Sequence, residues 1–151
     1  MVVIGSDHGG VVLKEAIKGF LAQRGLAVED LGTSGQSSVD YPDFGELVSR
    51  QVSNGTAELG VLVCGTGIGM SIVANKFPGV RAALISDEFT ARMSKEHNNA
   101  NIIVLGGRVV DVPEALRLVG TWLDSTFEAG RHQVRLDKIA QIEEDIRKGR
   151  I

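Results

Sequence analysis

Residues 61–70 constrain the fold of this chain more than any other stretch. They read Val61-Leu62-Val63-Cys64-Gly65-Thr66-Gly67-Ile68-Gly69-Met70. The apolar run at 61–63 is typical of a buried strand, and the three alternating glycines allow a tight turn in which the backbone approaches a ligand closely. Apolar residues at 68, 72 and 73 follow at helical spacing, so we expect a helix to begin inside the turn. This stretch therefore predicts the strand, turn and helix of an α/β protein.

The same turn carries groups that suggest a reaction centre. The first N–H groups of a helix have no intrahelical partner and attract anions. Cys64, the only cysteine, ends the strand beside them, where a thiol loses its proton more readily than in water. The pattern alone is weak, because such turns are common in α/β proteins and a lone buried cysteine is more often a small apolar residue.

Length and composition favour a single domain over residues 1–151, since no repeat or linker divides the chain. A net charge of -3 without a basic run argues against nucleic acid or a membrane surface as partner. One cysteine excludes an internal disulfide and fits a reducing compartment. Neither a leader segment nor a run of about 18 apolar residues is present, so we expect a cytoplasmic protein.

Five apolar runs alternate with helical patterns along the chain. We expect strands at 2–4, 27–31, 61–63, 80–85 and 102–105. The first helix should end at Gly25, the second should begin at Pro42, and Asp87 and Asp111 should cap two later helices. The alternation predicts a three-layer αβα sandwich around a Rossmann-like, five-stranded parallel sheet with right-handed crossovers.

Open parallel sheets bind ligands beyond the carboxyl ends of their strands. Four segments of this chain follow strands at that edge, and we expect them to converge: Asp7-His8, 64–69, Ser86-Asp87 and Arg108. The final helix precedes no strand, so its apolar residues at 136, 139, 142 and 146 are available for a second subunit. Arg131 and Arg135 lie one turn apart near its start and suit a phosphate.

Two site classes fit the sequence poorly. The histidines at 8, 97 and 132 and the single cysteine lack the short spacings of a zinc site, so we expect no metal. The first turn, Gly5-Ser6-Asp7-His8-Gly9-Gly10, departs from the Gly-x-Gly-x-x-Gly pattern of dinucleotide sites.

Six blocks occur in the order and spacing of the ribose-5-phosphate isomerase B family of sugar-phosphate isomerases, and the chain resembles that family over essentially its whole length. The blocks are Gly5-Ser6-Asp7-His8-Gly9-Gly10, Asp40-Tyr41-Pro42, Cys64-Gly65-Thr66-Gly67-Ile68-Gly69, Ala74-Asn75-Lys76, Glu96-His97-Asn98 and Gly130-Arg131-His132-Gln133-Val134-Arg135.

The resemblance implies an aldose-ketose isomerase that interconverts ribose 5-phosphate and ribulose 5-phosphate through a cis-enediolate, without a metal or other cofactor. It also implies a homodimer, or a pair of dimers, with sites at the interface and the C-terminal helix beside them. Cys64 matches the general base, and N–H groups of 65–69 and the Thr66 hydroxyl would contact the sugar oxygens.

By the same resemblance His97 matches the acid that opens the furanose ring. The positions that match substrate contacts are Asp7, His8, Gly65, Thr66, Gly67, Ile68, Gly69, Asn98, Arg108, Arg131 and Arg135. Among these, Asp7 and Asn98 would hold the sugar, and His8 and the two C-terminal arginines the phosphate. Without the resemblance, His97 is equally a core residue continuing the face of Phe89 and Met93, and the arginines a solvated face. His132 and Lys76 receive no chemical role.

Alternatives to the pentose reaction remain. Some family members carry an acidic base a few residues later and lack the cysteine, whereas this chain has Cys64 and a valine at 73, which favours the thiol. Isomerases of allose 6-phosphate and galactose 6-phosphate share most blocks. A regulatory module that binds a sugar phosphate without turnover is the alternative of a different class.

Overall fold

The computed structural model describes residues 1–151 and contains the predicted elements. The strands are β1 (Val2–Ser6), β2 (Val28–Asp30), β3 (Leu59–Cys64), β4 (Ala82–Leu84) and β5 (Ile102–Gly106). The helices are α1 (Val11–Gln23), α2 (Tyr41–Ser53), α3 (Ile68–Ala74), α4 (Glu88–Glu96), α5 (Val112–Asp124) and α6 (Arg131–Arg147). The turn expected after the first strand begins later than predicted, because β1 continues to Ser6 and a 3-10 turn, η1 (His8–Gly10), follows it.

The five strands form one parallel sheet in the order β2-β1-β3-β5-β4, as the α/β prediction requires. Cys64 pairs with Gly106 and Ser6 with Val63, so the central strands end at one edge. The chain leaves β1 for β2 and then returns past β1 to form β3. In sheets of this type, a reversal of this kind leaves a crevice beyond the carboxyl ends of the two strands. The rule therefore predicts the crevice here between the carboxyl ends of β1 and β3.

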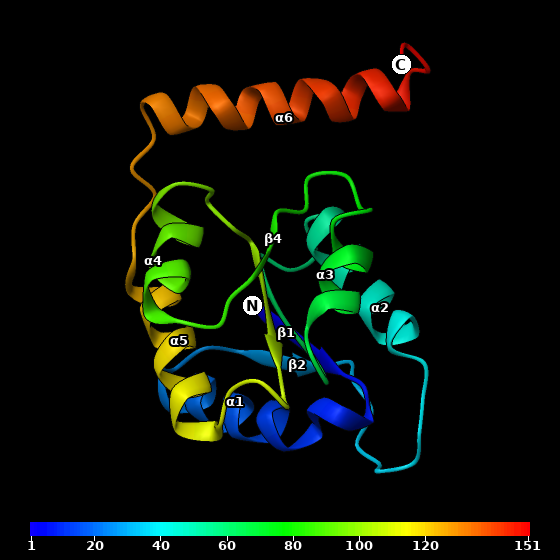
Figure 1. Ribbon diagram of the computed structural model, residues 1–151, viewed down its shortest axis with the longest axis vertical. Coiled ribbons are helices and arrows are strands. Elements are labelled where there is room, and N and C mark those ends of the chain that lie inside the picture. Colours follow the sequence, from blue (N-terminus) through cyan, green and yellow to red (C-terminus); the bar gives the residue numbers. More distant parts are fainter.

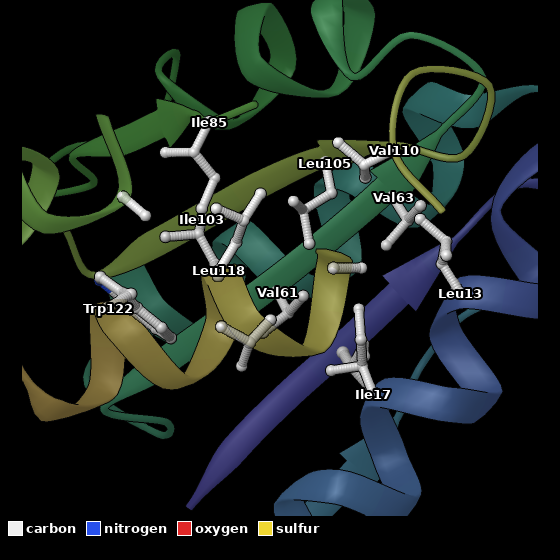
Figure 2. Packing of buried hydrophobic residues seen from close by; sticks show 14 of the residues in the cluster. Leu13, Ile17, Val61, Val63, Ile85, Ile103, Leu105, Val110, Leu118 and Trp122 are labelled. Atoms are coloured by element: carbon white, nitrogen blue, oxygen red, sulfur yellow. The ribbon is translucent and has the colours of Figure 1, made fainter. Parts of the chain in front are cut away.

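Helices cover both faces of the sheet. On one face α1, α4 and α5 pack on β1, β3 and β5, and Figure 2 shows Ile17 and Leu118 meeting the strand residues Val61 and Ile103. Trp122 is fully buried there and donates its indole N–H to the Ala100 carbonyl at 3.1 Å. On the other face α2 and α3 cover the second core cluster.

The residues predicted to begin and end helices form the expected contacts. Asp87 accepts a hydrogen bond from the Thr90 N–H at 2.7 Å, and Asp111 accepts one from the Glu114 N–H at 2.9 Å. Gly25 follows α1 with a φ of 77°, a left-handed conformation that favours glycine. Local side-chain chemistry therefore sets the beginnings and ends of these helices.

Two apolar stripes face outward, however. Ile68 and Ile72 of α3 are 56% and 57% exposed, because α3 packs on the sheet through Met70 and Ala74 instead. Phe89 of α4 is 63% exposed, and α4 buries Ala91 and Ser94. The interpretation of His97 as a core residue on the Phe89 face is therefore wrong.

Helix α6 stands apart from the three layers (Figure 1). Only His132 of this helix is buried, and Ile139, Ile142 and Ile146 are more than half exposed. Glu143 accepts the Gly79 N–H at 3.0 Å, and a cleft of about 350 Å³ lies between α6 and residues 80–83. The helix thus crosses the amino end of β4 with its apolar side largely free. No helix in the chain has both the length and the apolar character needed to cross a membrane.

Candidate active site

The turn after β3 places the Cys64 sulfur under a backbone donor. The Gly67 N–H donates to Cys64 Sγ at 3.2 Å, and Cys64 is 5% exposed. Gly67 has a φ of 81°, and a β-carbon there would lie 2.5 Å from Leu84 Cδ1, so the turn requires glycine for both backbone and space. The glycine at position 67 therefore holds the Cys64 sulfur and the N–H group that donates to it in one fixed turn.

Three further N–H groups of the turn, those of Gly65, Thr66 and Gly69, donate no hydrogen bond within the chain. The Ile68 N–H is occupied by Thr66 Oγ1 at 3.2 Å. Unpaired donors held in a fixed turn suit an oxygen that gains negative charge during a reaction. The predicted N–H cluster is thus present, apart from the Ile68 group that Thr66 uses.

The loop after β1 adjoins this turn. Asp7 is 8% exposed, and its Oδ1 accepts the Gly9 N–H at 2.9 Å. A β-carbon on Gly9 would lie 3.3 Å from the Gly65 nitrogen, so the two loops are in direct contact. The carboxylate of Asp7 is thereby held at the crevice between β1 and β3.

Arg108 closes the third side of the crevice. Its N–H donates to the Gly65 carbonyl at 2.9 Å, and its guanidinium carbon lies 3.5 Å from the position a β-carbon on Gly65 would occupy. The structure thus brings together Asp7, the turn at 64–69 and Arg108. A guanidinium over unpaired N–H groups is a good environment for an anionic ligand.

His8 faces the loop between β2 and α2. Its Nδ1 accepts the Val39 N–H at 3.2 Å, which fixes the tautomer with the proton on Nε2. The root of this loop is anchored to β1, because the Thr33 N–H donates to the Ser6 carbonyl at 3.1 Å. His8 therefore offers one N–H donor.

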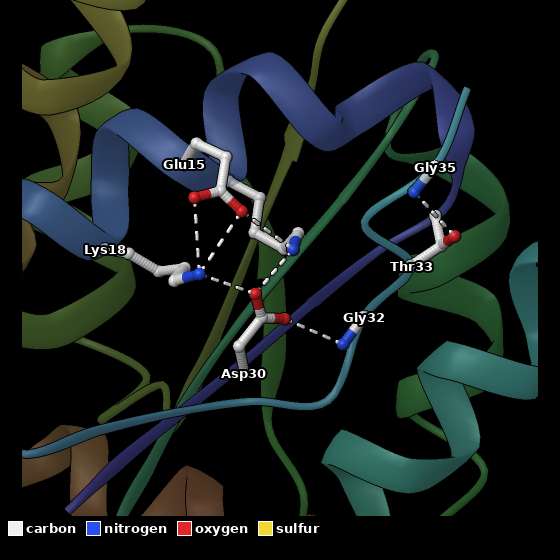
Figure 3. Close-up of polar contacts among 7 residues, drawn as sticks. Glu15, Lys18, Asp30, Gly32, Thr33 and Gly35 are labelled. Carbon is white, nitrogen blue, oxygen red and sulfur yellow. Dashed lines mark hydrogen bonds and ion pairs between the residues drawn. The ribbon is translucent and has the colours of Figure 1, made fainter.

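A buried ion-pair network holds the same loop. Asp30 accepts hydrogen bonds from Lys18 Nζ at 2.8 Å and the Gly32 N–H at 2.9 Å, as Figure 3 shows, and from the fully buried Lys14 at 2.5 Å. Burial alone would raise the pKa of Asp30, but the two lysines and the Gly32 N–H outweigh it and lower that pKa. The charged form of Asp30 thus pins the start of the loop that covers His8.

The remaining predicted residues lie at the opposite edge of the sheet. His97 directly follows α4, near the amino end of β5, and Asn98, Arg131 and Arg135 lie with it on exposed or half-buried positions. Gly60 pairs with Ile102 and Cys64 with Gly106, so four residues of strand, roughly 13 Å, separate the two edges. General acid and base catalysis need hydrogen-bond contact of about 3 Å, and the length of the strands separates the edge at Cys64 from the edge at His97 within one chain.

At that second edge His97 stacks on His132, with ring centroids 4.0 Å apart and planes at 14°. His132 is 5% exposed, and its Nε2 lies 3.5 Å from Glu128 Oε2. Burial lowers the pKa of His132, and the charges of His97 and the neighbouring arginines lower it further. Sequence reasoning gave His132 no role, because no spacing pattern reveals a contact between the end of α4 and the start of α6.

One ligand atom each from His97, Glu128 and His132 lies within 4.8 Å of the others, a grouping that the sequence spacings did not reveal. A metal needs nitrogen lone pairs that converge on it, and those lone pairs lie in the ring planes. Two nearly parallel rings in a stack direct them along parallel lines instead. The geometry therefore fits ring packing better than metal coordination.

Two quoted blocks acquire structural roles. A β-carbon on Gly69 would lie 2.4 Å from the Tyr41 ring, so Tyr41 of the Asp-Tyr-Pro block packs directly on the glycine turn. Asn75 accepts the Ala82 N–H and donates to the Ala82 carbonyl, both at 2.9 Å, and thereby ties the end of α3 to β4. Lys76 is exposed, and its side chain forms no hydrogen bond or ion pair within the chain.

Comparison with known proteins identifies relatives along nearly the whole chain. The model of the family described as Ribose/Galactose Isomerase matches residues 2–139. Ribose-5-phosphate isomerase B of Escherichia coli K12 is 41% identical over 143 residues, which cover 95% of this chain and 96% of that protein.

Solved structures agree. Ribose-5-phosphate isomerase B of Clostridium thermocellum superposes with a TM-score of 0.94 at 52% identity, covering 96% of this chain and 98% of that one. The Mycoplasma genitalium enzyme, solved with bound ribulose-5-phosphate, superposes with a TM-score of 0.92 at 42% identity, covering 95% of this chain and 96% of that one.

Proposed function

Because this chain belongs to the ribose/galactose isomerase family, we propose that it interconverts D-ribose 5-phosphate and D-ribulose 5-phosphate. The observation that carries the proposal is the donor geometry around Cys64. The Gly67 N–H bonds to the sulfur at 3.2 Å, and three other N–H groups of the same turn have no partner in the chain. A base and oxyanion donors held in one rigid turn are the two components that proton transfer beside a carbonyl requires.

In this mechanism Cys64 acts on the open-chain sugar. The thiolate removes the proton on C2, the electron pair forms the C1–C2 double bond, and the aldehyde oxygen gains charge as the enediolate forms. The N–H groups of Gly65, Thr66 and Gly69 stabilise that charge. The proton then moves from the C2 hydroxyl to the C1 oxygen, and the thiol returns a proton to C1. Asp7, held at the crevice, orients the sugar hydroxyls.

The phosphate is assigned to two groups beside the glycine turn and two arginines at the start of α6. Arg108 lies over the glycine turn, and His8 offers its Nε2–H because Val39 occupies Nδ1. Arg131 and Arg135 are exposed at the start of α6 and pair with no carboxylate in the chain. Arginines free of internal partners can form bidentate contacts with a phosphate.

A second copy of the chain completes each site in this proposal. His97, Asn98, Arg131 and Arg135 lie at the edge opposite Cys64, so a symmetric pair of chains would supply them to each other's crevice. Exposed apolar side chains line the surfaces that such a pair would cover. They are Ile68, Ile72, Leu84, Phe89, Ile139, Ile142 and Ile146. In the completed site His97 donates the proton that opens the furanose ring.

The test is the initial rate after chelator treatment on ribose 5-phosphate, allose 6-phosphate and galactose 6-phosphate. We expect kcat/KM to be highest for the pentose. A preference for a hexose phosphate would keep the mechanism and change the substrate. Binding of phosphate ligands without turnover of any sugar would favour the regulatory module.

A further inference from the structure

The segment between α5 and α6 folds back on the end of α4. The Glu128 N–H donates to the Glu96 carbonyl at 3.0 Å, and Ala129 and Gly130 then have positive φ angles of 55° and 54°. A left-handed conformation is unfavourable for alanine and persists only where its surroundings hold it. Because the chain reverses here, the first helical turn of α6 places the His132 ring against the His97 ring.

The stack is asymmetric in exposure. The His132 ring is buried, whereas His97 is half-buried and accessible. With centroids 4.0 Å apart, the buried ring forms a flat wall behind the accessible one. No side chain or backbone group of the same chain hydrogen-bonds either His97 ring nitrogen. The stack therefore limits the rotation of His97 and leaves both of its nitrogens open.

The charged groups around His132 come from three elements. They are His97 after α4, Glu128 in the linker, and Arg131 and Arg135 on α6. Burial and then the charges of His97 and the arginines lower the pKa of His132, and only Glu128 raises it. Burial and these charges therefore favour the neutral form of the His132 ring beside His97.

We propose that His132 is a positioning residue whose buried ring holds the His97 imidazole in one orientation toward the ring oxygen of the sugar. The inference rests on the proposed function, because it assigns His132 to the ring-opening step. In that step His97 gives a proton to the ring oxygen, the bond from C1 to that oxygen breaks, and the C1 hydroxyl releases its proton to water as the aldehyde forms. His132 does not contact the sugar, since its ring is enclosed between His97 and Glu128.

Two reactions of the full-length protein separate the role of His132 in ring opening from the proton transfer between C1 and C2. Turnover of ribose 5-phosphate requires ring opening. Deuterium uptake from D2O at C1 of ribulose 5-phosphate does not, because the esterified C5 oxygen cannot close a furanose ring. We expect His132→Ala to lower kcat for ribose 5-phosphate by about 10-fold to 100-fold with little change in KM, because a misoriented acid loses only part of the roughly 100-fold to 10,000-fold that general acid catalysis contributes. Deuterium exchange should change by less than about threefold.

Two substitutions at position 132 that differ in side-chain shape provide the matched comparison. His132→Phe keeps a flat ring in the stack, whereas His132→Leu keeps similar bulk without one. We expect the phenylalanine variant to retain kcat within about threefold and the leucine variant to behave like alanine. Gln133→Ala, an exposed neighbour that bonds only to Asp137, serves as the control and should match the wild type. The leucine and phenylalanine pair remains decisive if the alanine variant does not fold.

Equal losses in turnover and exchange would overturn the inference, and so would a phenylalanine variant as slow as the leucine variant. If the wild type performs both reactions and His132→Ala leaves both unchanged, only this inference fails. If the wild type performs neither reaction, the proposed function itself fails.

Discussion

The backbone N–H of Gly67 lies 3.2 Å from the sulfur of Cys64 and donates a hydrogen bond to it. Gly67 itself has a left-handed φ of 81°, which favours glycine at this position. The sulfur of the proposed base and its backbone donor are thus three residues apart in sequence.

Cys64→Ala should lower turnover of ribose 5-phosphate by about 100-fold or more, because general base catalysis typically contributes that much. Phosphate affinity should change little, since the arginines and His8 are untouched. Steady-state rates and calorimetric titration with a phosphate ligand test the two halves of the prediction. Near wild-type turnover would show that another group is the base.

Gly67→Ala should destabilise the fold by more than the roughly 1–3 kcal/mol that a strained φ costs, because its β-carbon would also press on Leu84. Gly25→Ala is the matched control, since Gly25 has a similar φ of 77° and no atom within 4 Å of an added β-carbon. Urea unfolding gives both values. Equal losses would show that Leu84 yields without cost.

Arg135→Ala should raise KM for ribose 5-phosphate with a smaller effect on kcat, because a phosphate contact binds substrate and transition state alike. Lys148→Ala at the C-terminal end of the same helix, also exposed, removes an equal charge 13 residues, roughly 20 Å, from Arg135. A comparable rise in KM for both variants would indicate general attraction by the helix.

Mixing Cys64→Ala with His97→Ala should restore activity if two chains share each site. A mixed pair would contain one site with both residues intact, so a symmetric dimer at random mixing should regain about a quarter of wild-type activity. The measurement is the rate after joint refolding of equal amounts. Continued inactivity of a confirmed mixed dimer would place both residues in one chain's site.

The Asp30 network predicts a loss of stability in acid. The pKa of Asp30 is lowered in the folded protein, so its contribution is complete above its ordinary value of about 3.9 and disappears as pH falls through the lowered value. Asp30→Asn should therefore destabilise the protein at pH 7 more than at pH 3. Urea midpoints at the two pH values test this, with Glu29→Gln, an exposed neighbour in the same strand, as control.

Sequence predicted the elements of this fold well, because strands and helix ends depend on nearby residues. Asp87 and Asp111 cap their helices through bonds to residues three positions later. The packing face of α3 was not predictable in the same way. Ile68 and Ile72 have helical periodicity, but only the sheet decides that Met70 faces inward.

The candidate site was also predictable only in part. The contact of Asp7, the glycine turn and Arg108 follows from the rule that parallel strands end at one edge. His132 could not be found from the sequence, since its contact with His97 depends on the turn at Ala129 and Gly130. The separation of Cys64 from His97 likewise depends on the direction in which α4 runs along the sheet.

Asn75 has a consequence for the solubility of the fold. β4 is the last strand of the sheet and is only three residues long, and its free edge would otherwise offer backbone groups to a strand of another molecule. The amide of Asn75 binds both the N–H and the carbonyl of Ala82, as an additional strand would. One side chain thereby occupies the backbone groups of Ala82 that a strand of another molecule would use, which opposes edge-to-edge pairing at the start of β4.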